Sequence, residues 1–328
     1  MKAVVYTRYG SPDVLRLGEV DKPAPADDEV LVKIHAASVN AADWHRLRGK
    51  PFFARFLIGG FRKPKYPVLG SDIAGRVEAV GKNVTQLQPG DEVFGGIGQG
   101  GFAEYASVRE SRLLAKPAHI SFASAAAVPI AAVTALQALR DKGQIRAGQK
   151  VLINGASGGV GTFAVQIAKA FGAEVTGVCS TRNLETARRI GADHVIDYTR
   201  EDFTQSGRHY DLIIDIAANH RVSDYKHILS TEGICVRTGF STVTHLLRAS
   251  LLGAWAARTG TRKFVSFTAH LKRDDLLLLT DWLAAGKLIP VIDRCYPLSQ
   301  VADAMRYFGV EHARGKVIIA LEPGSCTS

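Results

Sequence analysis

The sequence predicts an α/β protein in which a doubly wound parallel sheet is inserted between two pieces of a barrel-like antiparallel β domain. Three observations support this fold class. The length of 328 residues suggests about two domains. Short apolar, β-branched runs alternate with helical runs in the middle of the chain, whereas both ends alternate apolar and polar residues. We therefore expect one discontinuous domain of residues 1–120 and 289–328, and a second domain of residues 121–288.

The first 120 residues and the segment after Pro290 supply the antiparallel strands. Turns rich in Pro, Asp and Gly separate these strands, and only one short helix is expected among them, near Ala41 to Leu47. The expected strands are Lys2–Thr7, Val14–Val20, Glu29–Ala36, Ile73–Val80, Val291–Tyr296 and Lys316–Leu321.

The middle of the chain begins with an apolar strand, Val151–Asn154, that breaks into the glycine-rich turn Gly155–Gly161 and opens into a helix over Thr162–Phe171. Further strands follow in order, with helical runs between the earlier ones. This alternation predicts a parallel sheet that is covered on both faces. The later strands are expected at Glu174–Ser180, His194–Tyr198, Tyr210–Ala217, Gly233–Gly239 and near Phe267.

The glycine turn predicts a dinucleotide-binding site. Peptide N–H groups at the start of a helix carry partial positive charge and can hold a pyrophosphate. The spacing G-x-G-x-x-G falls on Ala156, Gly158 and Gly161, with Ala in the first place. The turn residues that we expect to contact the cofactor are Ala156, Ser157, Gly158, Gly159, Val160 and Gly161.

Composition limits the class of protein. No apolar run approaches the ~20 residues that span a bilayer, so stable membrane insertion is not expected, and Met1–Tyr6 is typical of a strand. The four cysteines show neither metal-type nor disulfide-like spacing. We therefore expect a cytoplasmic protein.

The net charge of +10 is concentrated in two segments, Arg46–Lys65 and Gly233–Arg273, which each hold seven basic residues and no carboxylate. A solvated surface, the rim of a pocket for an anionic cofactor or apolar substrate, and a nucleic-acid surface are all open, with nucleic acid the least favoured. The apolar helical run His245–Arg258 keeps a second class of function open, an RNA-binding or membrane-surface protein that retains a nucleotide pocket.

The chain resembles the medium-chain dehydrogenase/reductase superfamily, in its zinc-independent quinone oxidoreductase type. It looks closest to the branch of the chloroplast envelope quinone oxidoreductase homologue, the alkenal/one oxidoreductases and the reticulon-4-interacting protein. The resemblance implies a GroES-like catalytic domain and a Rossmann domain. The stretches that resemble the family are Ala37–Asp43, Leu69–Gly75, Gly90–Gly95, Gly101–Ala106, Ala125–Leu136, Gly155–Gly161, Gly191–Tyr198 and His312–Ile318.

The zinc alcohol dehydrogenases of this superfamily are the main alternative. A catalytic zinc needs Cys, His or carboxylate ligands. The corresponding positions here hold Asn40 in place of Cys and Ser71 in place of His, and no Cys occurs before Cys179. We therefore expect no zinc. Without a Lewis acid, hydride transfer from NADPH to a substrate that is already electrophilic, a quinone or an α,β-unsaturated ketone or aldehyde, is the favoured reaction.

The resemblance also implies roles for individual residues. Asn40 is expected to contact the substrate or its water network, and Asp43 to orient neighbours; either residue could instead be a helix cap. Apart from the resemblance, the apolar side chains of Phe52, Phe53 and Phe56 are expected to line the substrate pocket. The other implied cofactor contacts are Thr134, Asn219, Gly239 and Phe267, of which Thr134 and Phe267 could equally be core residues.

The end of the second parallel strand predicts NADPH rather than NADH. Residues 178–183 contain no carboxylate to accept bonds from a ribose 2′-OH. Arg182 instead offers a charged fork to a 2′-phosphate, and Ser180 adds a hydroxyl donor. Tyr198 resembles a further family contact with the phosphate or the adenine. A solvent-exposed Arg182 and a capping Ser180 are the alternatives. The family also implies a homodimer, with residues 235–270 at the contact.

Overall fold

The computed structural model describes residues 1–50, 55, 60, 62–238, 261–311 and 313–322. The chain divides into two compact units: residues 1–130, 271–286 and 290–328 form the first, and residues 131–270 and 287–289 form the second. The second unit is thus inserted between pieces of the first. This division places residues 121–130 and 271–286, which the predicted 121–288 domain includes, in the first unit.

The first unit is built on a seven-stranded sheet of order β14-β15-β3-β4-β5-β7, with β6 also paired to β3, and on the separate antiparallel pair β1–β2; both counts refer to the described residues. The pairs of β3 with β4, β6 and β15 are antiparallel, whereas β14 and β15 run parallel because α10 crosses between them. The strands are β1 (Lys2–Val5), β2 (Arg16–Glu19), β3 (Glu29–Ser38), β4 (Asp72–Val80), β5 (Glu92–Gly96), β6 (Tyr105–Arg109), β7 (Leu113–Ala115), β14 (Ile292–Pro297) and β15 (Lys316–Ala320).

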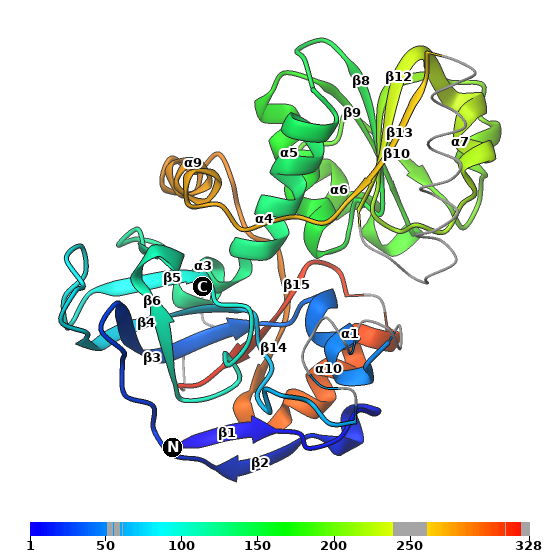
Figure 1. The fold of residues 1–328 in the computed structure, drawn as a ribbon. Helices are drawn as coiled ribbons and strands as arrows, with labels where there is room; N and C mark the ends of the chain where they lie inside the picture. Colours follow the sequence, from blue (N-terminus) through cyan, green and yellow to red (C-terminus); the bar gives the residue numbers. More distant parts are fainter. Residues whose placement is uncertain (51–54, 56–59, 61, 239–260, 312, 323–328) are drawn as a thin grey trace. The chain divides into compact units, whose positions relative to one another are not determined.

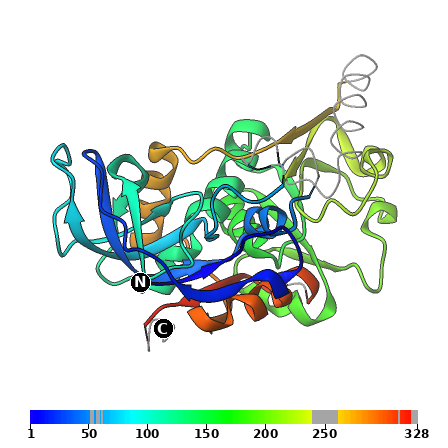
Figure 2. The same ribbon diagram turned by 60° about the horizontal axis from the view of Figure 1, so that its bottom comes forward.

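Helices cover this sheet in a few places. The expected helix near Ala41 is α1. The chain's last helix, α10, is the orange helix at the bottom of Figure 2, and its Arg306 donates to Asp13 of η1 across 2.5 Å. The hydrophobic core of this unit includes the fully buried side chains of Ile34, Leu47 and Ile73. The helical elements are η1 (Pro12–Val14), α1 (Ala41–Arg48), η2 (Glu110–Arg112), α3 (Phe122–Ala127), α9 (Arg273–Ala284), η6 (Leu298–Gln300) and α10 (Val301–Val310).

The second unit is a six-stranded sheet of order β10-β9-β8-β11-β12-β13 in the described part, and all its pairs are parallel. The order reverses beside β8, so α5 and α7 lie on opposite faces of the sheet (Figure 1). The predicted doubly wound sheet is confirmed. Its strands are β8 (Lys150–Asn154), β9 (Glu174–Cys179), β10 (His194–Asp197), β11 (Tyr210–Asp215), β12 (Leu229–Thr238) and β13 (Lys263–Phe267).

One strand begins earlier than the sequence predicts. β12 starts at Leu229 rather than Gly233, because its pairing with β11 shifts between Tyr210 and Leu212. That irregularity accommodates the polar residues 230–232, which hide the strand from pattern analysis. The helical elements of this unit are α4 (Pro129–Leu136, whose first two residues belong to the first unit), η3 (Gln137–Lys142), α5 (Gly159–Ala170), η4 (Thr181–Asn183), α6 (Leu184–Arg189), η5 (Phe203–Gln205) and α7 (Val222–Ile228).

The composition led to expectations about membrane-spanning helices and about the cysteines. Among the described residues, no helix is both long and apolar enough to cross a membrane. Cys179 and Cys235 are buried free thiols, but Cys295 in β14 is disulfide-bonded. The spacing of the cysteines did not indicate this bond, because the fold and not the spacing along the chain decides which thiols meet.

Candidate functional site

The fold requires glycine at positions 155 and 161 of the glycine turn but not at position 158. β8 ends at Asn154, Gly155 adopts a positive φ of 91°, and α5 begins at Gly159. A Cβ on Gly161 would lie 2.0 Å from the Gly155 carbonyl oxygen, so this glycine lets helix and turn pack closely. A Cβ on Gly158 would meet nothing nearer than 3.7 Å. The side of Gly158 is therefore open, as the approach of a pyrophosphate to the turn requires.

The turn is tied to the end of β9 by an asparagine that the sequence did not single out. Asn183 Nδ2 donates to Ser157 Oγ and to Ser180 Oγ, each across 3.1 Å. Ser180 precedes η4 but makes no side-chain cap, so the alternative role for this residue is not seen. The structure thus brings the two predicted serines to one place.

Two other predicted cofactor contacts follow the ends of β9 and β10. Arg182 is exposed in η4, and Tyr198 is 51% exposed just after β10. Asp197 ends β10 nearby, and its carboxylate accepts hydrogen bonds from the hydroxyls of Thr181, across 2.5 Å, and Thr199. The bond from Thr181 lowers the pKa of Asp197 below its usual range. Its negative charge is therefore already met by protein donors.

A buried polar network lies at the carboxyl ends of β8, β11 and β12. Asn154 Nδ2 lies 3.0 Å from Asp215 Oδ1 and 2.8 Å from Asn219 Oδ1, and Arg237 Nε donates to Asp215 Oδ2 across 2.7 Å. Asp215 also accepts from the N–H of Ala218, whose φ of 51° is unusual for a non-glycine residue. The network therefore fixes the loop after β11, which holds the predicted Asn219.

Of the remaining predicted site residues, the structure describes Thr134 and Phe267. Thr134 is half-buried in α4, and Phe267 is buried at the end of β13. Gly239 and the substrate-pocket residues Phe52, Phe53 and Phe56 lie outside the described residues, as does the run 245–258.

The first unit holds a second polar cluster, at the start of α1. Asp43 is fully buried; its carboxylate accepts from the Asn40 N–H across 3.0 Å and from Ser71 Oγ across 2.8 Å. Burial raises the pKa of Asp43, although Arg46, 3.8 Å away, opposes the shift. The bond from the Asn40 N–H is that of a capping box at the start of α1, which is the alternative role named above, and the bond from Ser71 shows that Asp43 also orients a neighbour.

Asp72 and Lys316 complete this cluster and were missed by sequence reasoning. Asn40 donates from Nδ2 to Asp72 Oδ2 across 3.0 Å and accepts at Oδ1 from Lys316 Nζ across 2.7 Å. Burial raises the pKa of Asp72 to about 6, although Lys316 and Asn40 oppose the shift, and burial lowers the pKa of Lys316. The available signal was weak: each is a charged residue at the start of an apolar strand.

The donor atoms of this cluster do not suit zinc. Asn40 and Ser71 present an amide and a hydroxyl, and both groups are engaged in hydrogen bonds within the protein. Within the described ranges, no three His, Cys, Asp or Glu side chains gather as a metal site would require.

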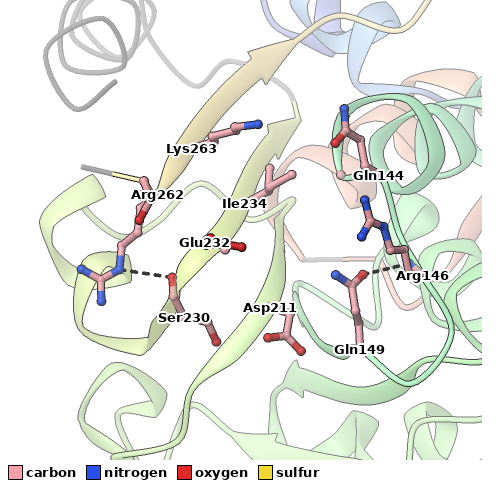
Figure 3. A pocket seen from close by; sticks show the side chains of 12 residues that line it. Gln144, Arg146, Gln149, Asp211, Ser230, Glu232, Ile234, Arg262 and Lys263 are labelled. Atoms are coloured by element: carbon pink, nitrogen blue, oxygen red, sulfur yellow. Dashed lines mark hydrogen bonds between the residues drawn. The ribbon is translucent and has the colours of Figure 1, made fainter. Parts of the chain in front are cut away.

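A cavity of about 620 Å³ lies at the amino ends of the parallel strands, whereas the glycine turn follows the carboxyl end of β8. Figure 3 shows Lys263 and Arg146 on two sides of the cavity with Ile234 between them, and Glu232 and Asp211 below. The lining contains both basic and acidic side chains. Ligands of open parallel sheets bind at the carboxyl ends of the strands, which is the other end of this sheet. The glycine turn, and not this cavity, therefore has the features of a dinucleotide site.

The chain is similar to known proteins over nearly its whole length. A family model described as alcohol dehydrogenase GroES-like domain matches residues 26–118, and one described as zinc-binding dehydrogenase matches residues 190–319. A chloroplastic quinone-oxidoreductase, QR1, from Triphysaria versicolor is 34% identical, with 97% of this chain and 98% of the relative covered.

Two further likenesses agree. A chloroplastic NADPH-dependent alkenal/one oxidoreductase from Arabidopsis thaliana is 34% identical, with 97% of this chain and 79% of the relative covered. The solved structure of a quinone oxidoreductase from Coxiella burnetii matches with a TM-score of 0.86 at 30% identity, over 98% of this chain and 99% of that one.

Proposed function

This chain belongs to the quinone oxidoreductase type of the medium-chain dehydrogenase/reductase superfamily, and we propose that it transfers hydride from NADPH to a quinone or an α,β-unsaturated ketone or aldehyde, without zinc. The observation that carries the proposal is the glycine turn, whose Gly158 side is open and whose Ser157 lies beside Ser180 at the end of β9. The names of the relatives supply the substrate class.

The residues of the second unit hold the cofactor. The N–H groups at the start of α5 bind the pyrophosphate. Ser180 and Arg182 bind the 2′-phosphate, and Tyr198 contacts that phosphate or the adenine. Thr134, Asn219, Gly239 and Phe267 contribute the contacts expected from the family. When bound, NADPH supplies the hydride.

The polar cluster of the first unit holds Asn40 in one orientation. Its Nδ2 faces Asp72 and Ser38, and its Oδ1 takes one bond from Lys316, which leaves a second lone pair on this oxygen. This lone pair accepts a hydrogen bond from the water network around the substrate. Asp43 keeps the start of α1 in place and moves no proton; the proton that completes enone reduction comes from solvent. Phe52, Phe53 and Phe56 line the substrate pocket.

The chemistry favours electrophilic substrates because Asn40 and Ser71 stand where the zinc dehydrogenases have metal ligands and both are held in hydrogen bonds within the protein, so they do not activate an alcohol through zinc. The test is anaerobic oxidation of NADPH against a panel of quinones, alkenals, alkenones and saturated aldehydes. With cofactor deuterated at C4, enone products should carry deuterium at the β-carbon. Turnover only with saturated aldehydes or alcohols would refute the proposal, and added zinc or a chelator should leave the rate unchanged.

Two finer features belong to the same proposal. β13 is an edge strand of the described sheet, and we propose a homodimer with residues 235–270 at the contact, although residues 239–260 lie outside the described ranges. Light scattering at micromolar concentration should give twice the chain mass. We also propose a cytoplasmic location, in which Cys179 and Cys235 stay reduced, although the disulfide of Cys295 is unusual for that compartment; fractionation of cells tests it.

A further inference from the structure

The side chain of Asn183 does not cap the helix that it precedes. Asn is among the residues most favoured at the position before a helix, because its side chain can bond the free N–H groups there. Asn183 stands in this position before α6 and makes no such bond. It is only 4% exposed, and its Oδ1 has no partner within the described residues. Its Nδ2 is used instead on the hydroxyls of Ser157 and Ser180.

These two bonds decide which way the serine hydroxyls point. A hydroxyl group has one O–H donor and two lone pairs. Because each Oγ accepts from Nδ2, neither hydroxyl can direct its proton at Asn183. Neither donates to another protein acceptor within the described part of the chain, and both serines are half-buried, so each has an open side. Both hydroxyl protons are therefore available to a ligand that is rich in acceptors.

The open sides lie where negative groups are expected. Ser157 belongs to the glycine turn at the start of α5, and Ser180 directly follows β9, two positions before the exposed Arg182. The nearby Asp197 carboxylate accepts from Thr181 and Thr199 and lies 3.5 Å from Arg200. Donors thus face both phosphate positions, while this carboxylate is neutralised within the protein.

We propose that Asn183 is a positioning residue that holds Ser157 and Ser180 as hydrogen-bond donors and thereby sets the preference for NADPH over NADH. The inference rests on the proposed function for the identity of the ligand. Ser157 serves the pyrophosphate that both cofactors carry, whereas Ser180 serves the 2′-phosphate that only NADPH carries. A change at Asn183 should therefore weaken both cofactors, but NADPH more.

The test is Asn183→Asp, with dissociation constants for NADPH and NADH measured by calorimetry. Aspartate has nearly the same shape, but its oxygens accept from both serine hydroxyls and turn their protons inward. We expect NADPH to bind at least a hundredfold more weakly and NADH about tenfold more weakly. The matched control is Gln205→Glu, which makes the same change of charge at an exposed position of the same unit and should shift neither constant more than twofold.

A second variant keeps the inference testable if Asn183→Asp does not fold. Ser180→Ala leaves Asn183 in place and should weaken NADPH about tenfold without changing NADH. Equal weakening of both cofactors by either variant would overturn the inference, since a merely structural role affects both alike. Because binding is measured without substrate, a wild type that binds NADPH but reduces no quinone or enone would count against the proposed function alone.

Discussion

The two polar clusters of the molecule differ in where their hydrogen bonds are directed. Around Asn40, the buried groups of Asp72 and Lys316 bond to one another and to the backbone of their own unit. Around Asn183, the amide donates to the hydroxyl oxygens of two half-buried serines. The first network is satisfied within the protein except for one lone pair of Asn40 Oδ1, whereas the second has two half-buried hydroxyls that make no further bond within the described residues.

The largest expected effect is a loss of folding stability when one charged residue of the Asn40 network is removed. Lys316→Met leaves the Asp72 carboxylate buried, with the Asn40 amide but without its cation. Removing one partner of a buried charged pair typically costs about 3–5 kcal/mol of folding free energy. We therefore expect a loss of this size in urea unfolding, with m unchanged.

The double variant Asp72→Asn/Lys316→Met should recover part of this loss, because no buried charge remains. Lys82→Met is the matched control, since the Lys82 side chain is 72% exposed in its ion pair with Asp27 and should contribute almost nothing. A Lys316→Met protein as stable as the wild type would mean that the cluster does not depend on the charge.

Within the glycine turn, two substitutions should separate folding from binding. Gly161→Ala places a Cβ 2.0 Å from the Gly155 oxygen, so the turn must move at a cost of about 3 kcal/mol, and NADPH binding should be lost. Gly158→Ala meets no protein atom nearer than 3.7 Å and should leave the melting temperature unchanged while it weakens NADPH. If Gly158→Ala binds NADPH like the wild type, the open side of the turn does not face the cofactor.

The next prediction concerns Arg182, the charged residue that we propose as a ligand of the 2′-phosphate. A charge-assisted phosphate contact contributes roughly 1.5–3 kcal/mol, so Arg182→Ala should weaken NADPH by roughly ten- to hundredfold. NADH lacks the 2′-phosphate and should bind as before. Titration of both cofactors at two salt concentrations is the measurement. Equal weakening of the two, or a wild type that binds them equally, would contradict the assignment.

The smallest effect should be the pH dependence of stability. Burial raises the pKa of Asp72 from 3.8 to about 6, so the folded state holds this proton more tightly than the unfolded state does. The resulting stability is complete below the unfolded pKa and is lost as the pH rises through about 6. Asp72 should make the protein about 1 kcal/mol more stable at pH 5 than at pH 7. Urea unfolding of Asp72→Asn should lack this difference.

The sequence by itself determined the elements whose signals are local. The strand, glycine turn and helix over residues 151–171 follow from apolar periodicity and glycine spacing, and the structure has them as β8 and α5. The missing carboxylate at residues 178–183 and the Asn and Ser at positions 40 and 71 were equally readable. Each depends only on neighbours along the chain.

The tertiary structure alone decided which polar groups meet. Lys316 and Asn40 lie 276 positions apart and come together only because β15 pairs with β3. Asn183 has the sequence of an ordinary helix cap, and its use on Ser157 and Ser180 depends on where the parallel sheet places the ends of β8 and β9. Local pattern fixes the elements, because periodicity acts over a few residues. The directions of buried polar side chains depend on partners that only the folded sheet brings within hydrogen-bond distance.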